Sequence, residues 1–292
     1  MKQEHTQNQK PQIYPKNLIP LYWRRKLKIA LYNLRHRRSE QIWVHPSGLG
    51  FRLQIADESI TIASINRWSK YRIGIAAEMY ELAKRYGIDS LASLLRDRVV
   101  IDVGANIGEL SLYCRQLGAK VIAIEPDPIN HSALCENIDG TGIQSFQTAL
   151  WHQNEILTFY SSVLRADSSL IPPDQYSDAF EIKAVTLDQF ALSRGLERVF
   201  LLKADTEGAE PEMLRGAKNV LTRTCFVSID CGPERQGAKT FDTCEQLLQE
   251  LGFCTSALDA KRNILLGTNP NELKTQHIDF KAIPFPAQWP PP

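Results

Sequence analysis

The stretch VVIDVGANIGELSL, from Val99 to Leu112, constrains the fold of this chain more than any other. Its first five residues are a β-branched run, typical of a strand that is buried on both faces of a parallel sheet. Gly104 ends that run, and the apolar residues after Gly108 continue with helical spacing as far as Gly118. The stretch therefore predicts a strand, a tight glycine turn and a helix, the unit that holds a nucleotide-like cofactor in doubly wound α/β folds.

The residues that follow complete a βαβ frame around the glycine turn. Val121 to Ile124 is a second short apolar strand, and it ends in Glu125, twenty-one residues after Gly104. An acidic side chain at that place accepts hydrogen bonds from a ribose diol. Asp127 and Pro128 have the residue types of a helix N-cap and first helical position, so a second helix is expected there.

The details of the turn favour S-adenosylmethionine (SAM) over a dinucleotide. The spacing is Gly-x-x-x-Gly instead of G-x-G-x-x-G, and Asn106 adds bulk where a pyrophosphate approaches closely. A carboxylate at Asp102 repels a pyrophosphate but suits the ammonium of a methionine moiety. The alternative is a glycine turn that only connects strand to helix.

Four segments of this chain resemble the FkbM-type SAM-dependent methyltransferases, over roughly residues 95 to 255. They are DVGANIGELSL (Asp102–Leu112), EPDP (Glu125–Pro128), VTLDQF (Val185–Phe190) and LLKADTEGAEPEMLRGA (Leu201–Ala217). The resemblance implies a Rossmann-like class I methyltransferase fold and an O-methyltransferase acting on hydroxyls of sugars, glycolipids or polyketides. The chain departs from the family at Thr206, where Val or Ile is more usual.

The candidate cofactor-binding residues lie at the ends of the first three predicted strands, the third being Ile143 to Leu150. They are Asp102, Gly104, Ala105, Asn106, Gly108, Glu125, Pro126, Asp127, Ala149 and Leu150. The last two are expected beside the adenine.

The candidate catalytic residues follow two further buried strands. Asp205 and Glu207 come after Val199 to Ala204, the fourth strand and neighbour of the first, and Asp230 ends the fifth. Ligands bind at the carboxyl ends of strands beside the point where the strand order reverses, so these carboxylates are expected at the reacting methyl. The alternative for Glu207, as for Glu210 and Glu212, is that it only complements a helix dipole.

A metal is not favoured at these strand ends. Two strand-end carboxylates resemble the magnesium site of catechol-type O-methyltransferases, but that pattern continues with Asn where this chain has Cys231. The six cysteines form no CxxC pair, so neither a zinc site nor a disulfide framework is indicated.

The N-terminal segment is strongly basic, although the whole chain has a net charge of only +1. Residues 16–38 carry eight Lys or Arg side chains and no acidic one, while Trp23, Leu27, Leu31 and Leu34 recur at helical spacing. This pattern predicts a basic amphipathic helix. Its apolar stripe either docks on the catalytic domain or lies on an anionic membrane surface, and nucleic acid is a weaker third partner.

The chain is expected to contain one large α/β domain with appendages. We expect a disordered N-terminus (1–15), the basic helix with a small α+β appendage (16–94), the methyltransferase domain (95–268) and a proline-rich, extended or disordered tail (269–292). With no signal peptide or spanning segment in sight, a cytoplasmic enzyme is expected, with peripheral association at the inner membrane surface if the helix binds lipid. The rival functions are a non-catalytic membrane-surface protein and an NAD(P)-dependent oxidoreductase.

Overall fold

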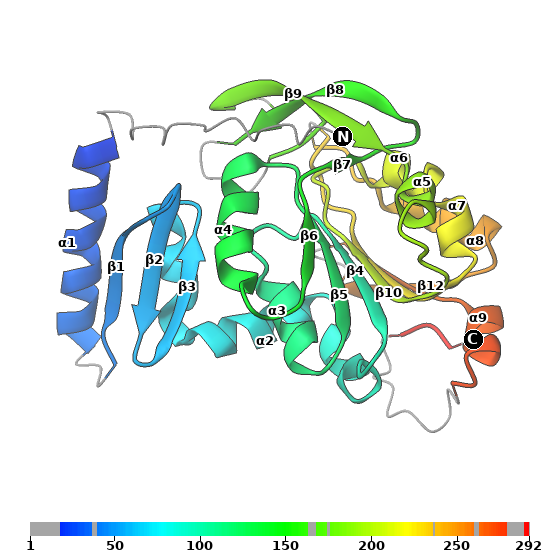
Figure 1. The fold of residues 1–292 in the computed structure, drawn as a ribbon, viewed down its shortest axis with the longest axis horizontal. Helices are drawn as coiled ribbons and strands as arrows, with labels where there is room; N and C mark the ends of the chain where they lie inside the picture. The colour runs from blue at the N-terminus through cyan, green and yellow to red at the C-terminus, as the bar shows by residue number, and fades with distance from the viewer. Residues whose placement is uncertain are drawn as a thin grey trace, which may run out of the picture.

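A seven-stranded sheet forms the centre of the molecule in the computed structural model (Figure 1). The structure describes residues 18–36, 40–162, 168–173, 176–235, 237–259, 263–278 and 289–291. In sheet order the strands are β12 (Cys254–Asp259), β13 (Ile264–Thr268), β11 (Thr224–Asp230), β10 (Val199–Ala204), β4 (Val99–Val103), β5 (Lys120–Ile124) and β6 (Gln144–Phe146). All neighbouring pairs are parallel except those made by β13, which is antiparallel to β11 and to β12. The predicted doubly wound sheet with a closing antiparallel strand is confirmed.

Both faces of this sheet are covered, which explains why the central strands are continuously apolar. Every residue of β10 is buried, and so are four of the five residues of β4. One face packs against α3 (Glu109–Gln116), α4 (Pro128–Ile138) and α9 (Pro270–Thr275). The other packs against α5 (Leu187–Leu192), α6 (Glu210–Arg215), α7 (Lys218–Leu221) and α8 (Phe241–Glu250). The strand order reverses between β4 and β10, and this point fixes where a ligand is expected.

A three-stranded antiparallel sheet forms the predicted appendage and docks on α4 (Figure 1). Its strands are β1 (Ile42–Ser47), β2 (Gly50–Ile55) and β3 (Glu58–Ile62), followed by η1 (Ile65–Ile73), α2 (Ile75–Arg85) and η2 (Ile88–Leu94). The side chain of Asn137 on α4 accepts from Thr61 N at 2.6 Å and donates to Thr61 O at 2.8 Å. Ile107 and Ala133 of the main domain belong to the same apolar core as the appendage. These contacts hold η1 and α2 against the catalytic domain.

The helix α1 (Leu18–His36) packs on the appendage with a face other than its apolar stripe. Ile29 is buried, whereas Trp23, Leu27, Leu31 and Leu34 are all more than half exposed. The alternative in which the apolar stripe docks on the domain is therefore wrong. Within the described residues, no helix is both long enough and apolar enough to cross a membrane.

Two expectations along the rest of the chain need correction. The predicted third strand is split: β6 completes the main sheet, while β7 (Ala149–Leu150) pairs with β9 (Asp178–Val185), itself paired with β8 (Glu155–Ser161), in a second sheet. The tail begins with the helix α9, and Trp289 is buried with its indole N–H donating to Gly87 O at 3.1 Å. The predicted N-terminus (1–15) and residues 279–288 of the tail lie outside the described residues.

Candidate active site

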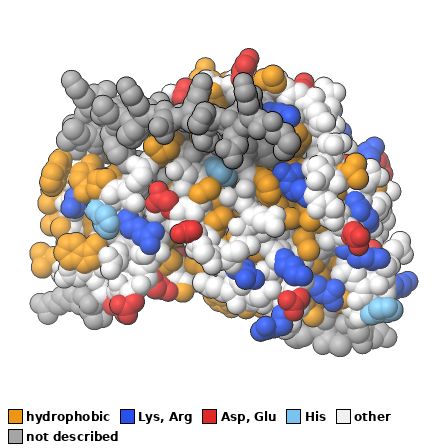
Figure 2. All heavy atoms as spheres, viewed as in Figure 1, with side chains coloured by type: hydrophobic (Ala, Val, Ile, Leu, Met, Phe, Trp, Pro, Cys, Tyr) orange, Lys and Arg blue, Asp and Glu red, His pale blue; other side chains and the backbone are white. Residues whose placement is uncertain are grey.

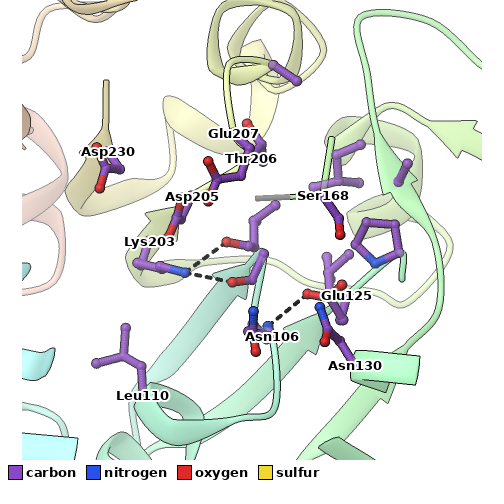
Figure 3. A pocket seen from close by; sticks show the side chains of 18 of the residues that line it. Asn106, Leu110, Glu125, Asn130, Ser168, Lys203, Asp205, Thr206, Glu207 and Asp230 are labelled. Carbon is purple, nitrogen blue, oxygen red and sulfur yellow. Dashed lines mark hydrogen bonds between the residues drawn. The ribbon is translucent and has the colours of Figure 1, made fainter. Parts of the chain in front are cut away.

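A cavity of about 260 Å³ lies at the carboxyl ends of the central strands, where the sequence predicts a cofactor (Figure 3). The glycine turn after β4, the ends of β5, β10 and β11, and β7 line it from the main domain. The appendage adds residues from η1 and α2, so two parts of the chain that are far apart in sequence line the cavity. Of the predicted residues, those on its wall are Gly104, Ala105, Asn106, Glu125, Pro126, Ala149, Leu150, Asp205, Glu207 and Asp230.

The glycine turn has the backbone that its sequence predicts. Gly104 has φ of +67°, and a Cβ built on it would lie 1.8 Å from Asp205 O, so no side chain fits between β4 and β10 at this point. Asn106 has φ of +53°, a conformation that Asn adopts at lower cost than most residues. At Gly108 a Cβ would meet Leu134 of α4 at 2.6 Å, so the absence of a side chain here lets α4 pack close to the turn.

The amides of the turn are already used within the protein. Gly104 N and Ala105 N both donate to Ile124 O, at 2.9 and 3.1 Å, and Asn106 N donates to Glu125 Oε2 at 2.8 Å. These three amides are therefore engaged within the protein and do not offer donors to a ligand. A pyrophosphate needs such donors, so the geometry disfavours a dinucleotide more strongly than the glycine spacing did.

Glu125 is a buried acceptor at the end of β5. Its Oε1 accepts from Asp127 N at 2.9 Å, and the side chain of Asn130 also donates to this carboxyl group. Burial, followed by the charge of Asp127, raises the pKa of Glu125 to about 8, although the hydrogen bonds from Asp127, Asn106 and Asn130 oppose the rise. A carboxylate has about four acceptor sites, so Glu125 retains capacity for hydroxyl donors in the cavity.

The carboxylates after β10 and β11 lie at one rim of the cavity (Figure 3). Tyr86, from the appendage, donates its hydroxyl to Asp205 Oδ2 at 2.7 Å. Burial, together with the negative charge of Asp205, raises the pKa of Asp230 to about 7. Burial, followed by the charge of Glu210, likewise raises the pKa of Glu234 to about 7. The rim therefore holds carboxyl groups that exchange protons near neutral pH.

Lys203 is a cavity residue that sequence reasoning missed. It lies in the buried strand β10, and its Nζ is 3.1 Å from Asp102 Oδ1, 3.2 Å from Val103 O and 2.9 Å from Gly104 O. Burial lowers the pKa of Lys203, but Asp102 and Asp205 raise it by more, so that the net shift is upward. A signal was present in the sequence, because Lys203 is the only charged residue in the run VFLLKA.

Comparison with known proteins identifies the domain that carries this cavity. The family model described as Methyltransferase FkbM domain matches residues 102–254, which are just over half of the chain. The chain belongs to the FkbM methyltransferase family. The FkbM assignment makes it a SAM-dependent methyltransferase, in agreement with the fold and against the oxidoreductase alternative.

Three curated methyltransferases are similar to this FkbM protein. Methyltransferase sdnD of Sordaria araneosa is 30% identical over 43% of this chain and 62% of its own length. Hexuronic acid methyltransferase AglP of Haloferax volcanii is 28% identical over 60% of this chain and 75% of its own. The 2-O-methyltransferase NoeI of Sinorhizobium fredii is 27% identical over 47% of this chain and 65% of its own. The match thus spans less than two thirds of sdnD and of NoeI.

Three predicted cofactor residues of the FkbM domain, Asp102, Gly108 and Asp127, are not on the cavity wall. Asp102 is buried and accepts from Ser111 Oγ at 2.6 Å, with Lys203 as its ionic partner. Asp127 is buried as the N-cap of α4, where it accepts from Ile129 N and from Ser161 Oγ. The structure therefore assigns both carboxylates to internal contacts instead of to the cavity.

The turn after β10 is fixed by a carboxylate that the sequence indicated only as a dipole partner. Glu210 Oε1 accepts from Thr206 N, Thr206 Oγ1 and Gly208 N at 2.9 to 3.1 Å, and its Oε2 accepts from Thr240 Oγ1. The Thr206 hydroxyl, at the position where the chain departs from the family, is thereby engaged in this turn. Glu207 has φ of +52° and lines the cavity. Among the described residues, no group of three or more His, Cys, Asp or Glu side chains has the arrangement of a metal site.

Proposed function

We propose that the protein is an O-methyltransferase that transfers a methyl group from SAM to a hydroxyl of an acidic sugar. Support for the cofactor comes from the donors and acceptors of the cavity wall. Glu125 offers acceptors for a ribose diol, and Ala149 and Leu150 offer an apolar wall for adenine. The turn amides are engaged within the protein, so they do not supply the donors that the pyrophosphate of a dinucleotide needs. SAM, when bound, supplies a methyl group on a positively charged sulfur, which suits the carboxylates of the rim.

The observation that carries the proposal is the position of the rim carboxylates beside the glycine turn. Asp205 N donates to Val103 O, which fixes Asp205 next to Gly104, and Asp230 lies at the end of the neighbouring strand β11. Methyl transfer to oxygen requires an aligned hydroxyl and an acceptor for its proton as the new C–O bond forms. A carboxyl group whose pKa is about 7 is matched to that task, so we assign the proton to Asp230 and the alignment of the hydroxyl to Asp205 and Glu207.

Support for an acidic acceptor comes from cations that the appendage contributes to the wall. Lys70 of η1 and Arg85 of α2 both line the cavity, and neither side chain forms a hydrogen bond or ion pair with another described residue. Burial, followed by the positive charge of Arg67, lowers the pKa of Lys70; the charges of Glu109 and Glu78 oppose this shift, and that of Arg85 adds to it. An anionic group between Lys70 and Arg85 would offset the cost of burying their positive charges and the repulsion between those charges. The similarity to a hexuronic acid methyltransferase is consistent with a carboxylate-bearing sugar.

The test compares two sugars that differ only in the acid group. Formation of S-adenosylhomocysteine is measured with glucuronic acid and with glucose, for the wild type and for the Lys70→Met and Arg85→Met variants. We expect glucuronic acid to be preferred, and each variant to raise its KM by about 10- to 100-fold, because a charge-assisted hydrogen bond contributes about 1.5 to 3 kcal/mol. Lys84→Met is the matched control, since Lys84 is an exposed cation of the same helix that pairs with Glu81.

Other outcomes separate the parts of the proposal. If the variants weaken SAM binding and leave the acceptor KM unchanged, the cations hold the carboxylate of SAM, and the acidic acceptor is wrong. If glucose and glucuronic acid react equally, the acid preference is wrong but O-methylation stands. The pH profile tests Asp230 separately: the wild-type kcat should rise with pH through about 7 as the carboxyl loses its proton, and Asp230→Asn should lower turnover by about 100-fold and remove that rise.

A further inference from the structure

The helix α1 presents a continuous apolar stripe to solvent at one end of the molecule. Trp23, Leu27, Leu31 and Leu34 are 63%, 62%, 56% and 77% exposed. Their spacing of four, four and three residues places them on one face of an α-helix. In Figure 2, hydrophobic side chains gather along the left edge of the molecule, which is where Figure 1 shows α1. Exposed apolar side chains that gather on one face mark an interaction surface more often than scattered ones do.

The opposite face of α1 fixes the stripe in this outward orientation. Ile29 is only 4% exposed and belongs to the core of the appendage, and the ring of Tyr22 stacks on Phe51 with centroids 5.9 Å apart. Asn33 donates to Ile42 O at 2.9 Å and accepts from Ile42 N at 3.1 Å, which pairs the outer edge of β1. Rotating the stripe inward would break these contacts. The stripe is therefore a fixed outer surface of the appendage.

The charges of α1 indicate what lies against this surface. From Leu18 to His36 the helix contains no acidic residue. The exposed side chains of Arg24, Lys28 and Arg35 each follow a stripe residue directly, so they line one border of the stripe about 100° around the helix. Long basic side chains at such a border extend to lipid phosphates while their stems cover apolar surface.

We propose that α1 lies in the plane of an anionic membrane surface, with the stripe at the headgroup boundary and the basic border on lipid phosphates. A second copy of the chain is a poorer partner. Two stripes packed face to face would bring together two helices whose charged side chains are all basic, and these would repel each other. Residues 1–17 are no better matched, since they carry three lysines and one glutamate. A membrane surface supplies both the apolar layer and the negative charge. This proposal does not depend on the identity of the methyl acceptor.

The test uses the full chain and vesicles of two compositions. Sedimentation is measured with phosphatidylcholine alone and with phosphatidylcholine containing phosphatidylglycerol. The wild type should sediment with the anionic vesicles only, and Leu27→Glu/Leu31→Glu should lower the apparent affinity by about tenfold or more. The matched control is Ile156→Glu/Leu192→Glu, which places the same charges at two apolar side chains that are 68% and 74% exposed elsewhere on the molecule. The control should bind as the wild type does.

Three results would overturn the proposal. The first is a wild type that does not sediment with anionic vesicles, and the second is equal loss of binding in both double variants. The third is a wild-type dimer in sedimentation velocity that Leu27→Glu/Leu31→Glu converts to a monomer, because the stripe then binds a second copy. Thermal unfolding of each variant checks the fold; the substituted side chains are exposed, so their midpoints should lie close to that of the wild type.

Discussion

The contact between Gly104 and Asp205 makes a quantitative prediction about the glycine turn. In the Gly104→Ala variant the new Cβ would lie 1.8 Å from Asp205 O, which is a backbone atom and cannot rotate away. The turn must move by more than an ångström from β10, or the left-handed φ of +67° must change. Gly195 is the matched control, because its φ is +62° and a Cβ built there meets nothing within 4 Å.

The two variants separate backbone strain from the collision. Strain of a left-handed alanine costs about 1 kcal/mol and acts in both proteins. The collision acts only at Gly104, and forced displacement of packed backbone adds about 1 to 3 kcal/mol. We therefore expect the free energy of unfolding, measured by urea titration, to fall by about 1 kcal/mol for Gly195→Ala and by about 2 to 4 kcal/mol for Gly104→Ala. Equal losses in the two variants would refute the close approach of β4 and β10.

Three further predictions concern buried charges of the same site. Glu125→Ala should weaken SAM binding by about 10- to 100-fold in calorimetric titration, because a charge-assisted acceptor is lost; an unchanged Kd in a folded variant would contradict the cofactor assignment. Since the pKa of Glu125 is about 8 without ligand and hydroxyl donors favour the carboxylate, wild-type binding at pH 7 should release a proton, and affinity should rise with pH up to about 8. Heats that are identical in buffers of different ionisation enthalpy would count against that linkage. Lys203→Met should reduce the unfolding free energy by about 3 to 5 kcal/mol because Asp102 stays buried without its cation. Lys203→Met/Asp102→Leu should recover part of that loss, because no charge is left buried although Gly104 O still lacks the hydrogen bond from the lysine.

The local parts of the site were predictable from the sequence. A β-branched run that ends in glycine, an acidic residue after the next strand and an N-capping Asp-Pro each depend on neighbouring residues only. The structure places Gly104 in the left-handed conformation, Glu125 at the end of β5 and Asp127 at the N-cap of α4, as their sequence patterns require. These features depend on strand and turn chemistry, which acts over a few residues.

The features that the sequence did not predict depend on contacts between distant segments. Lys70 and Arg85 reach the cavity only because the appendage docks on α4, a packing that no local pattern encodes. Periodicity correctly predicted that α1 is amphipathic, but it could not determine which face is buried. Ile29 and Asn33 are outnumbered by the apolar residues of the stripe, yet they make the contacts to the appendage. Hydrophobicity alone therefore did not determine which face of α1 is buried.

Lys203, which lines the cavity but was not predicted, is the ionic partner of Asp102, which was predicted to contact the cofactor but does not line the cavity. The two residues are direct partners in the register of β10 and β4, so a carboxylate and an ammonium that are each costly to bury neutralise one another. Lys203 also donates to the carbonyl groups of Val103 and Gly104. Val103 O also accepts from Asp205 N, so Lys203 adds a second donor there and supplies a donor to Gly104 O, where β4 turns away from β10. Asp102 thus acts on the cavity indirectly: it holds charged the lysine that fixes the backbone of the glycine turn.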